Sequence, residues 1–198
     1  MTPPRAWATA CGALALASAA FWLAAGSGWL LPQNWIWHAD GWPRAPWTLL
    51  TGALVHFQAP HWLGNLLALG AVAVLGAALG ATGRDALALL VAWPLGTLAL
   101  LLWPEVGGYW GLSGPIHAGV AVLALRALRE PGTRWLGRLL MAGLVFKLGL
   151  EAGWANPVGF NDAWGFNVVY AAHLTGAVAG LATALVLGWL PSASRQNS

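Results

Sequence analysis

Long apolar runs with very few charges dominate this sequence and restrict the folds that it can adopt. The first run, residues 7–25, is long enough to cross a hydrocarbon layer of about 30 Å at about 1.5 Å per residue. Hydrophobic residues make up 59% of the chain and charged residues only 8%, and fifteen residues are tryptophan. A water-soluble core of this size does not need so much apolar surface. The sequence therefore predicts an all-α membrane protein.

The apolar pattern predicts six membrane-spanning helices within one domain that covers residues 1–198. The second run is too long for one straight crossing, so part of it must tilt or lie outside the hydrocarbon core. Residues 26–46 are rich in Trp and Pro, which is typical of a loop that lies in the membrane interface. The expected spans are 7–25, 47–79, 86–103, 112–128, 135–150 and 166–190.

The distribution of basic residues predicts the orientation in the membrane. Six spans place both termini on the same side, and most arginines fall on that side, whereas Arg44 is the only basic loop residue on the other. By the positive-inside rule, the arginine-rich side is cytoplasmic. The arginines on that side are Arg5, Arg84, Arg126, Arg129, Arg134, Arg138 and Arg195.

A serine between glycines, Gly111-Leu112-Ser113-Gly114, stands where the fourth apolar run begins. Glycines let a backbone approach a bound substrate closely, and Pro115 suits the first turn of a helix. Ser113 is therefore expected at a helix N-terminus, whose free N–H groups can bind an oxyanion. Serine also caps helices routinely, so this motif gains weight only from partners elsewhere in the chain.

Polar residues inside the spans gather in the half of the membrane away from the cytoplasm, although burying them there is costly. Besides Ser113 they include His173 in the sixth run, and His56, His61 and Asn65 in the second. His61 and Asn65 are four apart and share a helix face. At about 100° per residue, His56 and His61 would point about 140° apart on one helix. This spacing favours a polar pair over a two-histidine metal site.

Metal and haem sites also use histidines from several helices. However, the sequence has no H-E-x-x-H motif and no span with a histidine and a carboxylate at ligand spacing, and the single cysteine, Cys11, is remote. We therefore expect neither a metal nor a cofactor. The net charge of +3 is too small and scattered to indicate nucleic-acid binding.

A serine and a histidine in one leaflet suit acyl transfer, because histidine can take the serine proton near neutral pH. The sixth run has no Asp or Glu near His173, so the expected apparatus is a Ser113/His173 dyad without an acidic third member. The Ser113 N–H and the side chains of His61 and Asn65 would stabilise the oxyanion. Taken singly, each residue also fits a hydrogen-bonded role in helix packing.

Small residues predict a close contact between the fourth and sixth runs. Gly176 and Gly180 follow His173 by three and seven residues, so all three share one helix face. Gly114 and Ala118 are four apart on the other run. Faces of small residues at this spacing let two backbones nearly touch. Such packing would bring the histidine toward the serine.

Taken together, three motifs resemble those of the rhomboid intramembrane serine proteases in order and spacing. They are Gly111-Leu112-Ser113-Gly114, His56-Phe57-x-x-x-His61-x-x-x-Asn65 and His173-x-x-Gly176-x-x-x-Gly180. The similarity covers nearly the whole chain, and it implies a six-helix bundle with a membrane-lying first loop. It also implies that Ser113 is the nucleophile, His173 the base, and His61 and Asn65 the oxyanion-hole donors.

Departures from the common rhomboid pattern resemble the rhombosortases of Gram-negative bacteria. His117 stands where many rhomboids carry an aromatic residue, and Lys147-x-x-x-Glu151 closes the fifth run. Rhombosortases are thought to process proteins with a C-terminal Gly-Gly sorting tail. The resemblance implies an inner-membrane endopeptidase, open to the periplasm, that cuts single-span substrates near their outer boundary. Its partners would be such substrates and membrane lipids. The alternative is a non-catalytic rhomboid-like protein that binds membrane helices.

Three further expectations concern the surroundings of the site. His117 lies one helical turn after Ser113, and we expect it to pack or hydrogen-bond against His173 rather than act as the base. Lys147 and Glu151 are expected to form an ion pair at the outer end of the fifth span. The loop at 152–165 is rich in Gly, Pro and Asn, which is typical of a mobile lid.

Overall fold

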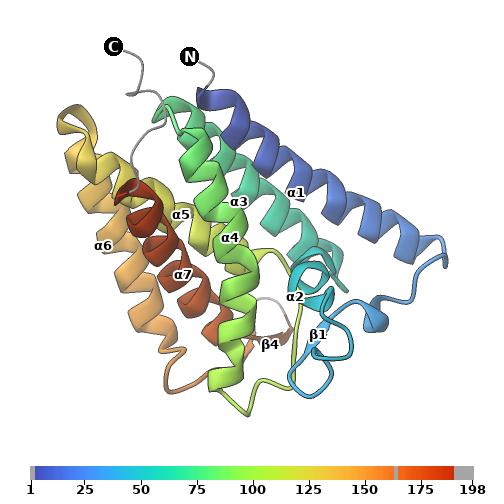
Figure 1. The fold of residues 1–198 in the computed structure, drawn as a ribbon. Helices are drawn as coiled ribbons and strands as arrows, with labels where there is room; N and C mark the ends of the chain where they lie inside the picture. Colours follow the sequence, from blue (N-terminus) through green and yellow to red (C-terminus); the bar gives the residue numbers. More distant parts are fainter. Residues whose placement is uncertain (1–2, 163–164, 190–198) are drawn as a thin grey trace.

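Helices dominate the computed structural model, which describes residues 3–162 and 165–189. The α-helices in these ranges are α1 (Pro3–Gly26), α2 (Thr48–Thr51), α3 (Ala59–Ala78), α4 (Gly83–Leu98), α5 (Ser113–Arg129), α6 (Arg134–Glu151) and α7 (Tyr170–Trp189). Short 3₁₀ turns are η1 (Pro32–Asn34), η2 (Gly52–Leu54), η3 (Ala99–Leu102) and η4 (Pro131–Thr133). The end of α7 and the start of α1 lie toward the same end of the bundle (Figure 1).

Two small antiparallel strand pairs join the helices, so the chain is mostly but not wholly helical. The first pair is β1 (Trp37–His38) with β2 (Gly108–Tyr109), and the second is β3 (Gly159–Asn161) with β4 (Phe166–Val168). Part of the predicted loop at 152–165 is therefore a strand of a hairpin. Residues 163 and 164 of that loop lie outside the described residues.

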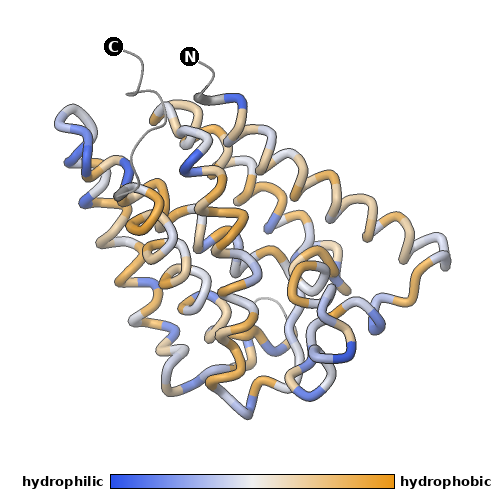
Figure 2. The backbone as a smooth tube through the Cα atoms, viewed as in Figure 1, coloured by the Kyte–Doolittle hydropathy of each residue, from blue (hydrophilic) through white to orange (hydrophobic). Residues whose placement is uncertain are grey.

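Within the described ranges, four helices are long and apolar enough to cross a membrane. They cover Arg5–Gly26, Ala59–Ala78, Gly83–Leu102 and Tyr170–Gly188. Large apolar side chains face outward on them, as in Leu16, Leu67 and Val186, which are 74%, 76% and 63% exposed. Figure 2 shows hydrophobic residues along the whole length of these helices. Because such surface is stable in lipid rather than in water, the chain is a multi-pass membrane protein.

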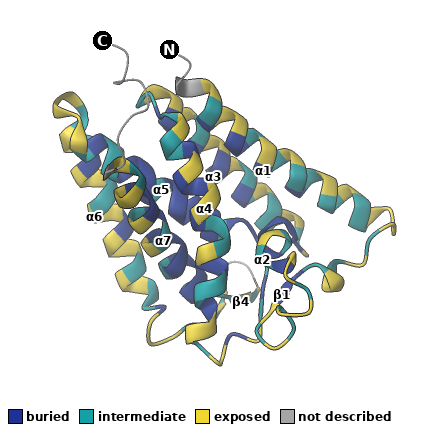
Figure 3. Cartoon of the chain, in the orientation of Figure 1, coloured by how far each residue is buried: buried dark blue, intermediate teal, exposed yellow. Residues whose placement is uncertain are grey.

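Helix α5 is the enclosed centre of the bundle, and it packs against α3, α4, α6 and α7. Eleven of its residues are buried, whereas α6 buries only Gly137 and Leu144. In Figure 3, α6 is mostly intermediate or exposed. The residues that begin α5 are therefore surrounded by protein rather than by lipid. This enclosure lets polar groups at its start be satisfied by neighbouring elements.

The predicted close packing of α5 and α7 is confirmed. A Cβ atom on Gly180 would lie 2.5 Å from the carbonyl oxygen of Ala118, and one on Gly176 would collide with the Gly114 carbonyl. On its other side α7 meets α4, where a Cβ on Gly96 would lie 3.2 Å from the Cα of Gly176. Small residues thus hold α7 against two helices at once.

Two expected spans differ in the structure. The run at 47–79 breaks into α2, η2 and α3, and Gln58 between them is extended (φ −122°, ψ 132°). Pro60 lies in the first turn of α3, where its missing N–H costs nothing. A helix from upstream cannot continue through this proline, because proline disfavours the helical conformation of the residue before it. The run at 166–190 begins as β4, and α7 starts only at Tyr170. Leu190 lies outside the described residues.

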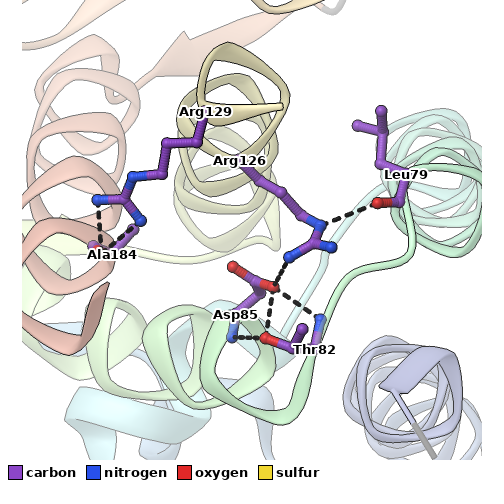
Figure 4. Close-up of polar contacts among 6 residues, drawn as sticks. All are labelled: Leu79, Thr82, Asp85, Arg126, Arg129 and Ala184. Carbon is purple, nitrogen blue, oxygen red and sulfur yellow. Dashed lines mark hydrogen bonds and ion pairs between the residues drawn. The ribbon is translucent and has the colours of Figure 1, made fainter. Parts of the chain in front are cut away.

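Two arginines in the last turn of α5, at the opposite end of that helix from Ser113, contact neighbouring helices. Figure 4 shows these contacts. Arg126 donates to the carbonyl of Leu79 at 2.9 Å and to Asp85 at 3.0 Å. The same carboxylate forms a capping box with Thr82 at the start of α4. The guanidinium of Arg129 reaches a backbone carbonyl of α7 at 3.4 Å. These contacts tie the ends of α3, α5 and α7 together.

Candidate active site

Ser113 is the first residue of α5, as the sequence predicted, and a tight glycine turn presents it. Gly111 in that turn has φ +96°, a region that side chains disfavour. A Cβ on Gly111 would also lie 2.8 Å from the His61 ring. Glycine at this position therefore lets the chain turn and lets an imidazole approach the serine loop.

Tyr109 holds the same turn from inside the protein. Its hydroxyl donates to the carbonyl of Gly111 at 2.7 Å and accepts from the N–H of Gly114 at 3.3 Å. Burial raises the pKa of the Tyr109 phenol, so the hydroxyl keeps its proton and makes both bonds. Our sequence reasoning missed this residue. The available signal was general, since a buried tyrosine hydroxyl requires a partner.

His56 joins the serine loop to α3. Its Nδ1 lies 3.3 Å from the Leu54 carbonyl, and its Nε2 lies 3.4 Å from the Leu112 nitrogen and 2.9 Å from Asn65 Nδ2. One tautomer satisfies all three contacts, with the proton on Nδ1 and Nε2 as acceptor. The predicted divergence of His56 and His61 is wrong, because His56 precedes α3. Their ring centroids are 5.0 Å apart.

The Asn65 amide bridges the two imidazoles. Besides His56, its Nδ2 lies 3.0 Å from Nε2 of His61. Both amide hydrogens are thus directed at ring nitrogens in this state. To donate to an oxyanion, Asn65 would have to give up one of these hydrogen bonds and form one with the substrate oxygen. The sequence placed Asn65 and His61 correctly on one helix face, but it did not show this competing use of the amide.

His173 contacts a carboxylate that the sequence reasoning did not assign to it. Its Nδ1 lies 2.8 Å from Glu151 Oε2, which extends from the end of α6. The expectation of a histidine without an acidic neighbour is therefore wrong, because the carboxylate comes from α6 and not from the helix that carries His173. The predicted pair of Lys147 and Glu151 is confirmed, with Nζ to Oε1 at 2.6 Å.

His117 stacks on His173, as expected, with ring centroids 4.2 Å apart and planes inclined by 11°. Its Nδ1 lies 2.7 Å from the Ser113 carbonyl. His117, Glu151 and His173 offer ligand atoms within 4.8 Å of one another, a grouping that the sequence did not suggest. An imidazole binds a metal in the plane of its ring, so two parallel rings do not converge on one ion. The cluster suits hydrogen bonding better than metal binding.

One cavity of about 610 Å³ collects the predicted site residues. Ser113, His173, His61 and Asn65 all line it, together with His117 and Lys147. Helix α6 supplies an aliphatic wall through Leu139, Leu140 and Leu144. Cavities of this size accommodate small molecules or short peptide segments. His56 and the glycines Gly111, Gly114, Gly176 and Gly180 shape the surrounding backbone rather than the cavity wall.

The fold and this cavity describe a multi-pass membrane protein with a polar site enclosed among its helices. The Rhomboid domain family matches residues 43–190. Over 156 residues, the chain is 31% identical to the Rhomboid protease GlpG of Enterobacter sp. (strain 638). The aligned region covers 74% of this chain and 52% of that protein. The chain thus spans about half the length of this relative. Since the family covers most of the sequence, the chain belongs to the rhomboid family.

Proposed function

We propose that this protein is an intramembrane serine endopeptidase with Ser113 as nucleophile and His173 as base. The observation that carries the proposal is that both residues line one cavity, on helices whose backbones touch at Gly176 and Gly180. Membership of the rhomboid family and the similarity to a protein named a rhomboid protease support it. The alternative, a non-catalytic binder of membrane helices, has no need for this serine and histidine together.

The reaction would proceed through an acyl-enzyme. His173 takes the proton of the Ser113 hydroxyl as the oxygen attacks the scissile carbonyl carbon. The Ser113 N–H, with His61 and Asn65, would stabilise the oxyanion that develops. His173 then protonates the leaving amine, and water hydrolyses the ester by the reverse sequence of proton transfers. Aliphatic α6 residues on the cavity wall would shield these steps from bulk water.

The membrane arrangement that we propose is one domain over residues 1–198 with six spans, in which α5 and α6 join the four apolar helices. Residues 26–46 would lie in the membrane interface, and the exposure of Trp29, at 91%, suits that position. The arginine bias supports cytoplasmic termini and an active site that opens to the periplasm of a bacterial inner membrane. Arg195, which contributed to that bias, lies outside the described residues.

The substrate class that we propose is a single-span membrane protein with a C-terminal Gly-Gly tail, as in the rhombosortases. A peptide bond within an α-helix is shielded, so the protease must receive an unwound segment. Glycine lowers the cost of unwinding because it is a poor helix former. The mostly apolar lining of the cavity supports binding of a segment that leaves a membrane helix.

Fluorophosphonate labelling combined with cleavage of a single-span substrate in vesicles tests the activity. Ser113→Ala and His173→Ala should each abolish both signals in a folded, inserted protein. The double variant should be little worse than either single variant, because the two groups act as a unit. Ser27→Ala, at an exposed serine, is the matched control. Wild-type turnover by Ser113→Ala would remove the protease proposal.

A further inference from the structure

A carboxylate from α6 contacts one ring nitrogen, Nδ1, of the proposed base. Glu151 Oε2 lies 2.8 Å from Nδ1 of His173, and both side chains are largely shielded, at 13% and 7% exposure. Its other oxygen, Oε1, accepts from Lys147 at 2.6 Å. The two carboxylate oxygens are therefore divided between two donors. This division leaves Nε2 of the imidazole for the serine.

We propose that Glu151 is a positioning residue that converts the Ser113/His173 pair into a serine–histidine–glutamate triad, with Lys147 orienting the carboxylate. The proposal rests on the proposed function of the site. Glu151 accepts a hydrogen bond from Nδ1–H and so holds the imidazole proton on that nitrogen. The lone pair of Nε2 then stays unprotonated and available as the base. When the Ser113 proton moves to Nε2, the nearby carboxylate stabilises the positive charge of the imidazolium.

The backbone turns sharply after α6, directly after Glu151. Ala152 ends the helix in the left-handed region (φ 46°, ψ 43°), and its N–H donates to the Leu148 carbonyl at 2.9 Å. The next residue, Gly153, packs so closely that a Cβ would lie 2.6 Å from the carbonyl oxygen of Tyr170. Tyr170 begins α7, one turn before His173. The turn thus sets the end of α6 against the first turn of α7.

A plain ion pair of Lys147 and Glu151 would explain only half of this geometry. On one helix such a pair contributes little to stability when it is exposed, and the Lys147 side chain is 52% exposed. The contact with His173 instead crosses between two helices, at a helix end where Ala152 adopts a left-handed, strained conformation. The rings of His117 and His173 also stack, which limits rotation of the base about its own axis.

Replacing Glu151 with Gln tests the proposal, because glutamine has one oxygen where glutamate has two. Lys147 can only donate, so it competes with His173 for that oxygen. When Lys147 wins, the amide NH₂ faces Nδ1 and moves the imidazole proton to Nε2, which is the wrong tautomer for a base. Glu151→Gln should then lower kcat by about 10²- to 10⁴-fold, with KM nearly unchanged.

A second substitution separates positioning from mere packing. In Glu151→Gln/Lys147→Met the amide oxygen has no competing lysine and is available to the Nδ1 proton. The double variant should therefore recover about tenfold or more of the lost kcat. Lys147→Met alone should lower kcat less than Glu151→Gln does, because the carboxylate remains to accept from Nδ1–H.

The outcomes distinguish this proposal from the proposed function. Wild-type kcat in a folded Glu151→Gln protein, or no recovery in the double variant, would overturn the positioning role while Ser113-dependent cleavage remains. Absence of Ser113-dependent labelling and cleavage in the wild-type protein would instead overturn the protease assignment itself. Thermal unfolding in detergent reports whether each variant is folded before its rate is compared.

Discussion

The imidazole of His117 lies parallel to that of His173, 4.2 Å away between ring centroids. The two rings come from α5 and α7, and His117 is also linked to Ser113 through the carbonyl of that serine at 2.7 Å. A histidine therefore stands next to the serine on the same helix as well as across the cavity. Which of the two imidazoles removes the serine proton is a question that substitution can answer.

We expect His117→Phe to keep turnover within about tenfold of wild type, because a flat ring preserves the stacking without any base. His173→Phe should abolish turnover. His117→Ala should fall between them, since it removes the ring that packs against His173. Cleavage rates at saturating substrate provide the comparison, and loss of activity in His117→Phe equal to that in His173→Phe would assign the base to His117.

Tyr109→Phe should disturb the loop that presents Ser113 without changing the helices that form the cavity wall. The substitution leaves the Gly111 carbonyl and the Gly114 N–H without their buried partner, which costs about 1–3 kcal/mol. We expect lower thermal stability and a slower labelling rate of Ser113. Tyr170→Phe, on a half-buried tyrosine of α7, is a control for loss of a hydroxyl. Equal labelling by Tyr109→Phe and wild type would show that the loop keeps its shape without this hydroxyl.

Gly180→Ala tests the packing of α7 against α5. The added methyl would meet the Ala118 backbone, which cannot move away as a flexible side chain can. Overpacking of this kind costs about 1–3 kcal/mol, so the unfolding temperature should fall. Gly149→Ala on α6 is the matched control, because its Cβ would meet nothing within 4 Å. A Gly180→Ala protein as stable as Gly149→Ala would contradict the close backbone contact.

Features that depend on spacing along one helix were predictable from the sequence. Lys147 and Glu151 are four apart, and Gly176 and Gly180 share a face, because helical geometry alone fixes these relations. Ser113 at the start of α5 followed from the glycines and proline around it. Each of these inferences used only local rules.

Features that depend on turns between elements were not predictable in the same way. His56 joined Asn65 because Pro60 starts a new helix, so an angle measured on one continuous helix did not apply. Glu151 contacts His173 from a different helix, 22 residues away, and the left-handed alanine that ends α6 next to it is not indicated by composition. Tyr109 lies in a short strand whose partner is more than seventy residues earlier, at Trp37. Such contacts become visible only when the chain is folded.

The substrate proposal predicts a dependence on small residues. Replacing the Gly-Gly of a single-span substrate with Leu-Leu should suppress cleavage even when the apolar helix is kept, because leucine strengthens the helix by about 1 kcal/mol per residue. Mass spectrometry of the products locates the cut, which we expect near the outer membrane boundary. Equal cleavage of both substrates, or a cut on the cytoplasmic side, would contradict the substrate class or the proposed topology.

The β3–β4 hairpin borders the site, and Phe166 on β4 contacts the ring of His61. The Phe166 ring lies 4.9 Å from the His61 ring between centroids, and Phe166 and Ser113 both line a small gap of about 10 Å³ beneath the hairpin. A phenyl ring in that place keeps the hairpin down and narrows the route to the serine. Phe160 on the paired strand is 63% exposed and lines neither that gap nor the main cavity.

Phe166→Ala should therefore raise the rate at which a fluorophosphonate labels Ser113, on the order of threefold. The substitution widens the route to Ser113 and leaves the chemical step unchanged. The stability of the bundle should change little, since the hairpin lies at its edge and few core residues contact it. Phe160→Ala should leave the labelling rate unchanged, which controls for loss of an aromatic side chain from the hairpin. A slower rate in Phe166→Ala would mean that this ring holds His61 in a productive position. That result would contradict a role of the hairpin as a barrier above the serine.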